Sequence, residues 1–112
     1  MDMDVARIMF ELRRVGCTLF VGEDGAVHGR MRPGMRMPLE ARPLVDALRL
    51  GNAEAVRLMA LERTVVVDED TFDDAAWKER MREHRIELAG PVVVDPNAGT
   101  ATIIYREVER NE

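Results

Sequence analysis

The chain of 112 residues is 46% hydrophobic and 33% charged, with a formal net charge of −5, a composition typical of a soluble globular protein with its own core. Its acidic balance argues against non-specific binding to nucleic-acid phosphates, and its single cysteine, Cys17, excludes an internal disulfide. No run approaches the roughly 18 consecutive apolar residues of a membrane span, and no signal peptide is recognisable, so we expect a cytoplasmic protein.

The first half of the chain predicts the element order α-β-β-α-α. A helix begins after Asp2 or Asp4 and ends at Gly16, because apolar residues recur between them at helical spacing. A β-hairpin follows, with strands at residues 17–21 and 26–32 joined at a turn signal. Two short helices then flank the break at Gly51-Asn52. The apolar positions of the first of them are Leu44, Val45, Leu48 and Leu50.

The second half predicts the order β-α-β-β. Residues 65–67, 92–94 and 101–105 are β-prone and should form one sheet, and residues 72–85 form a helix capped by Asp70 or Thr71. Both alternating sets of residues in these strands are apolar, which predicts burial of both faces, by the helix or by a second copy. The predicted fold is a single compact α+β domain, in which residues 63–112 pack on residues 1–62.

The stretch AVHGRMRPGMRMP, residues 26–38, alternates arginine and methionine on both sides of Pro33-Gly34. Because successive side chains of an extended chain point to opposite faces, the arginines should share one face and the methionines the other. Such a strand can accept an extended peptide on a basic, adaptable surface. The predicted partner-binding residues are Arg30, Met31, Arg32, Met35, Arg36 and Met37. The alternative is that the methionines belong to the core and the arginines to a solvated rim.

Within residues 4–61, the run Leu12-Arg13-Arg14-Val15-Gly16-Cys17-Thr18-Leu19 precedes a turn at Asp24-Gly25 and a strand that reaches Arg32-Pro33-Gly34. This arrangement resembles the TubC-type N-terminal docking domains of nonribosomal peptide synthetase and polyketide synthase subunits. In that family an α-β-β-α-α unit receives a short acidic peptide of the upstream subunit on its hairpin. The resemblance implies that residues 26–32 are the receiving strand and that Arg30 and Arg32 are its peptide-binding charges.

Two features set the chain apart from these docking domains. Gly51-Asn52-Ala53-Glu54 stands where the family usually has a lysine, and a β-α-β-β region follows in place of a condensation or ketosynthase domain. Freestanding proteins of similar appearance occur in plasmids and phages. We therefore expect a non-enzymatic protein–protein interaction module from a mobile element, acting as an adaptor or an inhibitor on a partner with an acidic or mixed contact segment.

An acidic cluster lies between the first strand and the helix of the second half: Asp68, Glu69, Asp70, Asp73 and Asp74. It lacks the spacing of a calcium loop, and the first interpretation is that it caps a helix and complements the helix dipole. The alternative is an anti-defence inhibitor of a phage or plasmid, similar to an anti-CRISPR protein, that binds a basic nuclease complex through this acidic surface. A third function, a nucleic-acid-binding accessory protein, is disfavoured by the net charge and the single lysine.

The sequence indicates no catalysis, no metal site and no cofactor. His28 and His84 are the only histidines, and Cys17 is expected to be a buried, inert thiol. A nucleophile pair of Cys17 and His28 across the hairpin would lack a third group to orient it. The glycine-rich nucleotide motifs and the G-x-S-x-G motif of hydrolases do not occur.

The last predicted strand indicates self-association. Residues 100–105 are uncharged and rich in β-branched side chains, so this strand either lies inside the sheet or pairs with its copy across a two-fold axis. We expect the second arrangement, a homodimer through residues 100–105.

Overall fold

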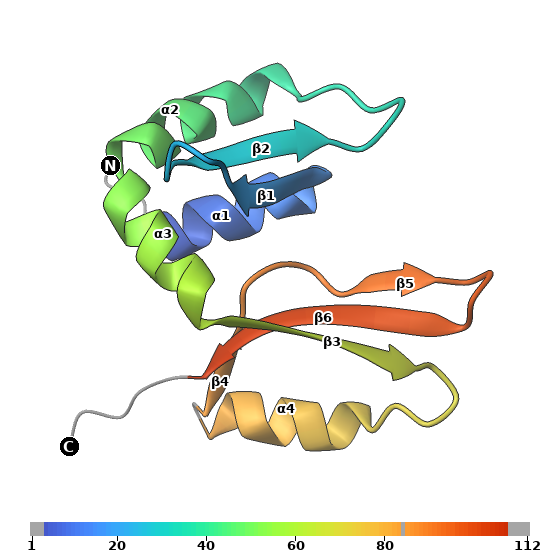
Figure 1. Cartoon of the computed structure of the whole chain (residues 1–112). Helices are drawn as coiled ribbons and strands as arrows, with labels where there is room; N and C mark the ends of the chain where they lie inside the picture. Colours follow the sequence, from blue (N-terminus) through green and yellow to red (C-terminus); the bar gives the residue numbers. More distant parts are fainter. Residues whose placement is uncertain (1–3, 84, 108–112) are drawn as a thin grey trace. The chain divides into compact units, whose positions relative to one another are not determined.

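The computed structural model describes residues 4–83 and 85–107, and it is an α+β structure, as the sequence predicts (Figure 1). The chain divides into two compact units, Met1–Ala60 and Leu61–Glu112. Each unit has its own sheet, of two strands in the first and four in the second. Among the described residues, no helix combines the length and the apolar character needed to cross a membrane.

The first unit begins with α1 (Val5–Arg14), and local sequence signals set both of its ends. At the start, the side chain of Asp4 accepts a hydrogen bond from the Ala6 N–H at 3.0 Å, so Asp4 is the capping residue. At the end, Gly16 has a φ of 95°, a conformation that residues with a side chain rarely adopt. The chain then turns directly into β1 (Cys17–Val21).

β1 and β2 (Val27–Met31) form the predicted antiparallel hairpin, which closes at a turn where Gly25 has a φ of 77°. Alternate residues of each strand face opposite sides of the hairpin. The inner face contributes Cys17, Leu19 and Val27 to the core of the unit. The outer face carries four exposed residues, Thr18, Phe20, His28 and Arg30.

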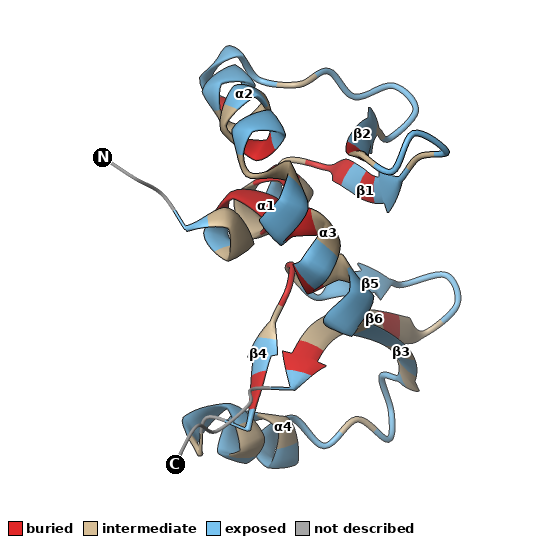
Figure 2. Ribbon diagram, turned by 60° about the vertical axis from the view of Figure 1, so that its left-hand side comes forward, coloured by how far each residue is buried: buried red, intermediate tan, exposed pale blue. Residues whose placement is uncertain are grey.

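Three helical segments complete the predicted α-β-β-α-α order: a short 3-10 helix η1 (Leu39–Ala41), α2 (Arg42–Leu50) and α3 (Asn52–Leu61). The buried residues of this unit, red in Figure 2, come from all of its larger elements. They include Met9 and Leu12 of α1, Leu48 of α2 and Ala55 of α3. Leu50, the last apolar position predicted for α2, is 93% exposed, because the helix ends there.

The second unit contains an antiparallel sheet of β3 (Glu62–Asp68), β4 (Ile86–Leu88), β5 (Val93–Asp95) and β6 (Thr100–Glu107). The three predicted strands all belong to this sheet. β4 has no counterpart in the prediction, because a strand of three residues with a glutamate at its centre leaves no periodic signal. β3 begins earlier than predicted and follows α3 without an intervening loop.

β6 is the central strand of this sheet. It pairs with β3 along one edge and with β4 and β5 along the other. The predicted homodimer through residues 100–105 is therefore corrected, because both edges of this strand already have partners within the chain. The edges of the sheet are formed instead by β3 on one side and by β4 and β5 on the other.

α4 (Asp74–Arg82) is shorter than the helix predicted over residues 72–85, and His84 in that range lies outside the described residues. The helix begins after Asp73, whose side chain accepts a hydrogen bond from the Ala76 N–H at 2.9 Å. Asp73 is therefore the cap, and the prediction of Asp70 or Thr71 is wrong. Trp77 of α4 packs edge-on against Tyr105 of β6, with ring centroids 5.3 Å apart, so α4 covers one face of the sheet.

The sheet of the second unit is covered less completely than predicted. On β6, Ala101 and Ile103 are buried on the face that also carries Tyr105, whereas Thr102 and Ile104 on the other face are only partly buried. On β3, Val66 is 61% exposed. Apolar residues on both faces of these strands therefore do not mean that both faces are buried.

Candidate functional site

β2 presents an open backbone edge. The ends of the hairpin ladder are marked by hydrogen bonds from the Arg32 N–H to the Gly16 carbonyl at 3.2 Å and from the Gly22 N–H to the Ala26 carbonyl at 2.8 Å. In an antiparallel pair, every second residue exchanges hydrogen bonds with the neighbouring strand. The intervening residues of β2 therefore direct their N–H and C=O groups away from β1. These residues are Val27, Gly29 and Met31.

Only one of these three edge residues has a partner for its N–H group. The Val27 N–H donates to the Asn52 Oδ1 at 2.8 Å, which ties the start of β2 to the start of α3. Within residues 4–83 and 85–107, the outward N–H groups of Gly29 and Met31 have no hydrogen-bond partner. Unpaired strand groups of this kind are a template for a further strand.

The three arginines predicted for the site are exposed. Arg30 lies on the outer face of β2, and its guanidinium carbon is 5.5 Å from the centroid of the Phe20 ring, a cation–π contact that holds the charge beside the edge. Arg32 and Arg36 follow in the loop before η1. In the part of the chain that the structure describes, none of the three has a carboxylate partner. Their charges are therefore available to a ligand.

Two of the three methionines predicted for the site do not share a surface with the arginines. Met31 and Met37 are partly buried and pack against the core of the first unit. Met35 is 46% exposed, and its side chain lies so close to Gly16 that a Cβ there would be 2.8 Å from the Met35 Cε. The prediction that Met31 and Met37 form a contact surface is corrected: their apolar side chains are placed in the core, and the arginines form the rim.

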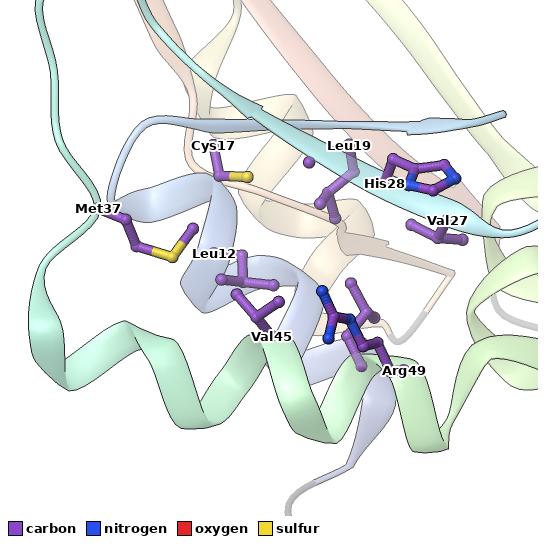
Figure 3. A pocket seen from close by; sticks show the side chains of 10 residues that line it. Leu12, Cys17, Leu19, Val27, His28, Met37, Val45 and Arg49 are labelled. Atoms are coloured by element: carbon purple, nitrogen blue, oxygen red, sulfur yellow. The ribbon is translucent and has the colours of Figure 1, made fainter.

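A pocket of about 180 Å³ lies between the hairpin and α2 (Figure 3). On the hairpin side it is lined mainly by inner-face residues, among them Leu19 and Gly29, and also by His28. On the helix side it is lined by Val45 and Leu48, and Figure 3 shows the Arg49 side chain reaching from α2 toward β2. Gly29 therefore belongs both to the open edge of β2 and to the pocket.

Cys17 and Gly29 fit against each other inside this pocket. A Cβ on Gly29 would lie 2.5 Å from the Cys17 Sγ, so the absence of a side chain on Gly29 leaves the space that the thiol occupies. Burial raises the pKa of the Cys17 thiol, against the smaller opposing effects of the Arg30 backbone and the Arg13 charge. The thiol is thus neutral at physiological pH and acts as a small apolar group.

His28 lies on the outer face of the hairpin, where its Nε2 is 3.0 Å from both carboxylate oxygens of Asp24. Cys17 points to the inner face, so the structure does not bring Cys17 and His28 together as a nucleophile pair. The second histidine, His84, lies outside the described residues. Among the residues that are described, no three potential ligands lie close enough to hold a metal ion.

The acidic cluster is exposed, but three of its five members have local structural roles. Asp68 accepts a hydrogen bond from the Asp70 N–H at 2.9 Å, Asp73 caps α4, and Asp74 forms an ion pair with Lys78 at 2.7 Å. These contacts favour the interpretation of the cluster as a turn and a helix cap over a dedicated binding surface.

Sequence reasoning missed the pocket and the contribution that Val45 and Arg49 of α2 make to its lining. Both belong to a predicted helix, but the helical pattern does not show which side of that helix meets β2. The one usable signal was Gly29, because a glycine in the middle of a strand marks the close approach of another group.

The resemblance of residues 4–61 to TubC-type docking domains stays a prediction. No protein-family model, characterised protein or solved structure matches the chain.

Proposed function

We propose that the chain is a non-enzymatic peptide-binding module, an adaptor or an inhibitor, that captures an extended segment of a partner protein along the outer edge of β2. The observation that carries the proposal is the pair of unpaired backbone N–H groups at Gly29 and Met31, beside exposed arginines. A strand added at this edge would form backbone hydrogen bonds with both residues.

The charges around the edge support an acidic segment as the ligand. Arg30 lies on β2, and Arg32 and Arg36 follow it without carboxylate partners among the described residues. An exposed ion pair contributes only about 0.2–1 kcal/mol, so no single arginine decides the affinity. The backbone bonds would therefore hold the segment, and the three charges together would select acidic sequences and speed their association.

The proposal is tested by panning a phage-displayed library of random seven-residue peptides against the chain. The unaltered chain should enrich acidic sequences. The triple variant Arg30→Glu, Arg32→Glu and Arg36→Glu should bind the enriched peptides about 10- to 100-fold more weakly, because three attractions become repulsions. Its melting temperature should stay within about 3 °C of the unaltered value, because the three side chains are exposed.

A matched control separates this local effect from the change in net charge. It reverses three exposed arginines at other positions, Arg7, Arg63 and Arg85. We expect the control to bind the peptides nearly as well as the unaltered chain. Full binding by the Arg30, Arg32 and Arg36 variant would place the contact elsewhere, and equal loss in both variants would mean that net charge alone governs binding.

A further inference from the structure

The pocket beside β2 would allow the proposed peptide site to distinguish between peptides of different sequence. Resting on the proposed function, we infer that the pocket receives one large apolar side chain of the bound segment and that an acidic residue lies next to it on the Arg30 side. The recognised pattern is therefore an apolar residue with an acidic neighbour.

The pattern follows from the alternation of side chains along a strand. On a strand added to β2, the residue opposite Gly29 faces the same side as Gly29, which is the inner side, where the pocket lies. The residues before and after it face the outer side, next to His28 and Arg30. Gly29 has no side chain, and the Cys17 Sγ occupies the space beside its Cα, so this inward residue would reach the pocket past the thiol.

The size and lining of the pocket match one side chain. Its volume is about 180 Å³, and an engineered protein cavity of about 150 Å³ lined by apolar residues binds benzene. There is thus room for a leucine, methionine or phenylalanine side chain but not for two of them. The lining is mixed: Leu12, Leu19, Val45 and Leu48 contribute apolar side chains, and His28 and Arg49 contribute polar groups.

The charge of Arg30 explains why the neighbour on the outer side should be acidic. Arg49 lines the pocket from α2, and Arg30 lies beside Gly29 on β2. In the described ranges, neither arginine has a carboxylate partner. An acidic residue on the outer side, next to Arg30, brings opposite charges together while its apolar neighbour is buried on the inner side.

The test uses synthetic fluorescein-labelled peptides that carry the sequences enriched by panning, each with a version in which the central apolar residue is alanine. Fluorescence anisotropy measures their affinity for the unaltered chain and for two variants. Val45→Phe fills the pocket from the helix side. Leu50→Phe adds a similar side chain at a position of α2 that is 93% exposed and does not line the pocket.

We expect the alanine version to bind about 10- to 100-fold more weakly, the loss that corresponds to one unburied large apolar side chain. Val45→Phe should weaken the original peptide to a similar extent and have no effect on the alanine version, whereas Leu50→Phe should change neither. If Val45→Phe does not fold, as judged by circular dichroism, the comparison of the two peptides on the unaltered chain still shows whether binding depends on one large apolar side chain.

The remaining outcomes separate the pocket from the edge. Acidic peptides that show no preference for an apolar residue, but that need Arg30, Arg32 and Arg36, would overturn the pocket and leave the edge intact. A library without any enriched sequence would overturn both. Binding of decanoic acid that is lost in Val45→Phe, together with peptides that ignore this substitution, would assign the pocket to a small apolar molecule and contradict the inference.

Discussion

A single carboxylate, Asp24, organises the turn of the hairpin. It accepts a hydrogen bond from the Ala26 N–H at 3.0 Å and lies at the same distance from the His28 Nε2. The contact with His28, and to a lesser degree the one with Ala26, holds the pKa of the Asp24 carboxyl below its usual range. Asp24 therefore closes the turn and fixes the orientation of His28 on the outer face of β2.

We expect these contacts to stabilise the hairpin at neutral pH and to be lost in acid. The Asp24 pKa is lower in the folded than in the unfolded chain, so the stabilisation is complete above the unfolded value of about 3.9 and disappears as the pH falls through the folded value. An NMR titration of the Asp24 carboxyl carbon should show a lowered midpoint. His28→Ala should raise this midpoint, and Glu23→Gln in the same turn should not. An unchanged midpoint in His28→Ala would show that His28 is not its main cause.

At the scale of secondary-structure elements, Arg106 joins three strands of the second unit. It lies on β6 with 3% of its surface exposed. Its Nη1 is 3.2 Å from the Glu62 Oε2 on β3, and its Nη2 is 3.1 Å from the Glu87 Oε1 on β4. The Glu62 side chain is also buried, at 8% exposure, whereas that of Glu87 is 54% exposed. The ion pair with Glu62 is thus shielded from water, and the one with Glu87 is not.

We expect Arg106→Met to lower the free energy of unfolding by about 3–5 kcal/mol, because it leaves the buried Glu62 carboxylate without this partner. Glu87→Gln removes the exposed partner and should cost at most about 1 kcal/mol. Urea unfolding followed by circular dichroism measures both changes. Equal losses of stability in the two variants would mean that the buried ion pair with Glu62 contributes no more than the exposed one with Glu87, contrary to this expectation.

The elements that the sequence predicted well are those whose ends depend on neighbouring residues. α1 is fixed by Asp4 and Gly16, and the hairpin is fixed by its turn, so the information lies within a few residues of each element. β4 exists because Leu88 pairs with Tyr105 of β6, far along the chain. No local pattern contains that pairing. The error on β6 has a related cause, because the sequence predicts β3 and β5 but does not contain the order in which they pair with β6.

The candidate site divides in the same way. The sequence alone predicts that Arg30 and Met31 point to opposite faces, because side chains alternate along a strand. Which of the two faces is covered depends on where α2 lies, and here the sequence left both interpretations open. The pocket lies between Gly29 on one element and Val45 on another, so only the tertiary structure reveals it.

At the scale of the whole chain, the two units differ strongly in charge. Residues 1–60 contain nine basic and eight acidic side chains, whereas residues 61–112 contain seven basic and thirteen acidic ones. The proposed peptide site lies entirely in the nearly neutral unit. The core cluster that supports the site is also made only of residues from this unit. The acidic unit would therefore repel an acidic ligand at long range.

This asymmetry predicts the behaviour of a chain truncated after residue 61. We expect it to fold, with modest stability for its size, and to bind the enriched acidic peptides at least as tightly as the full chain. The advantage should be largest at low ionic strength and vanish near 1 M salt, where the Debye length is about 3 Å. Circular dichroism checks the fold, and fluorescence anisotropy at several salt concentrations checks the binding. Tighter binding by the full chain would mean that residues 62–112 contribute contacts.

The close fit of Cys17 and Gly29 also limits the order in which the hairpin can accumulate mutations. Gly29 has no positive φ, so its backbone would accept alanine, and the obstacle is the sulfur of Cys17 on the neighbouring strand. Cys17→Ala removes that sulfur, after which the nearest remaining atom to an alanine Cβ at position 29 is the Leu19 Cδ2, in ordinary contact at 3.6 Å. In the reverse order the intermediate protein carries the clash. The two positions therefore form an epistatic pair in which substitution of Cys17 should precede substitution of Gly29. Related proteins with a larger residue at position 29 should lack a cysteine at position 17.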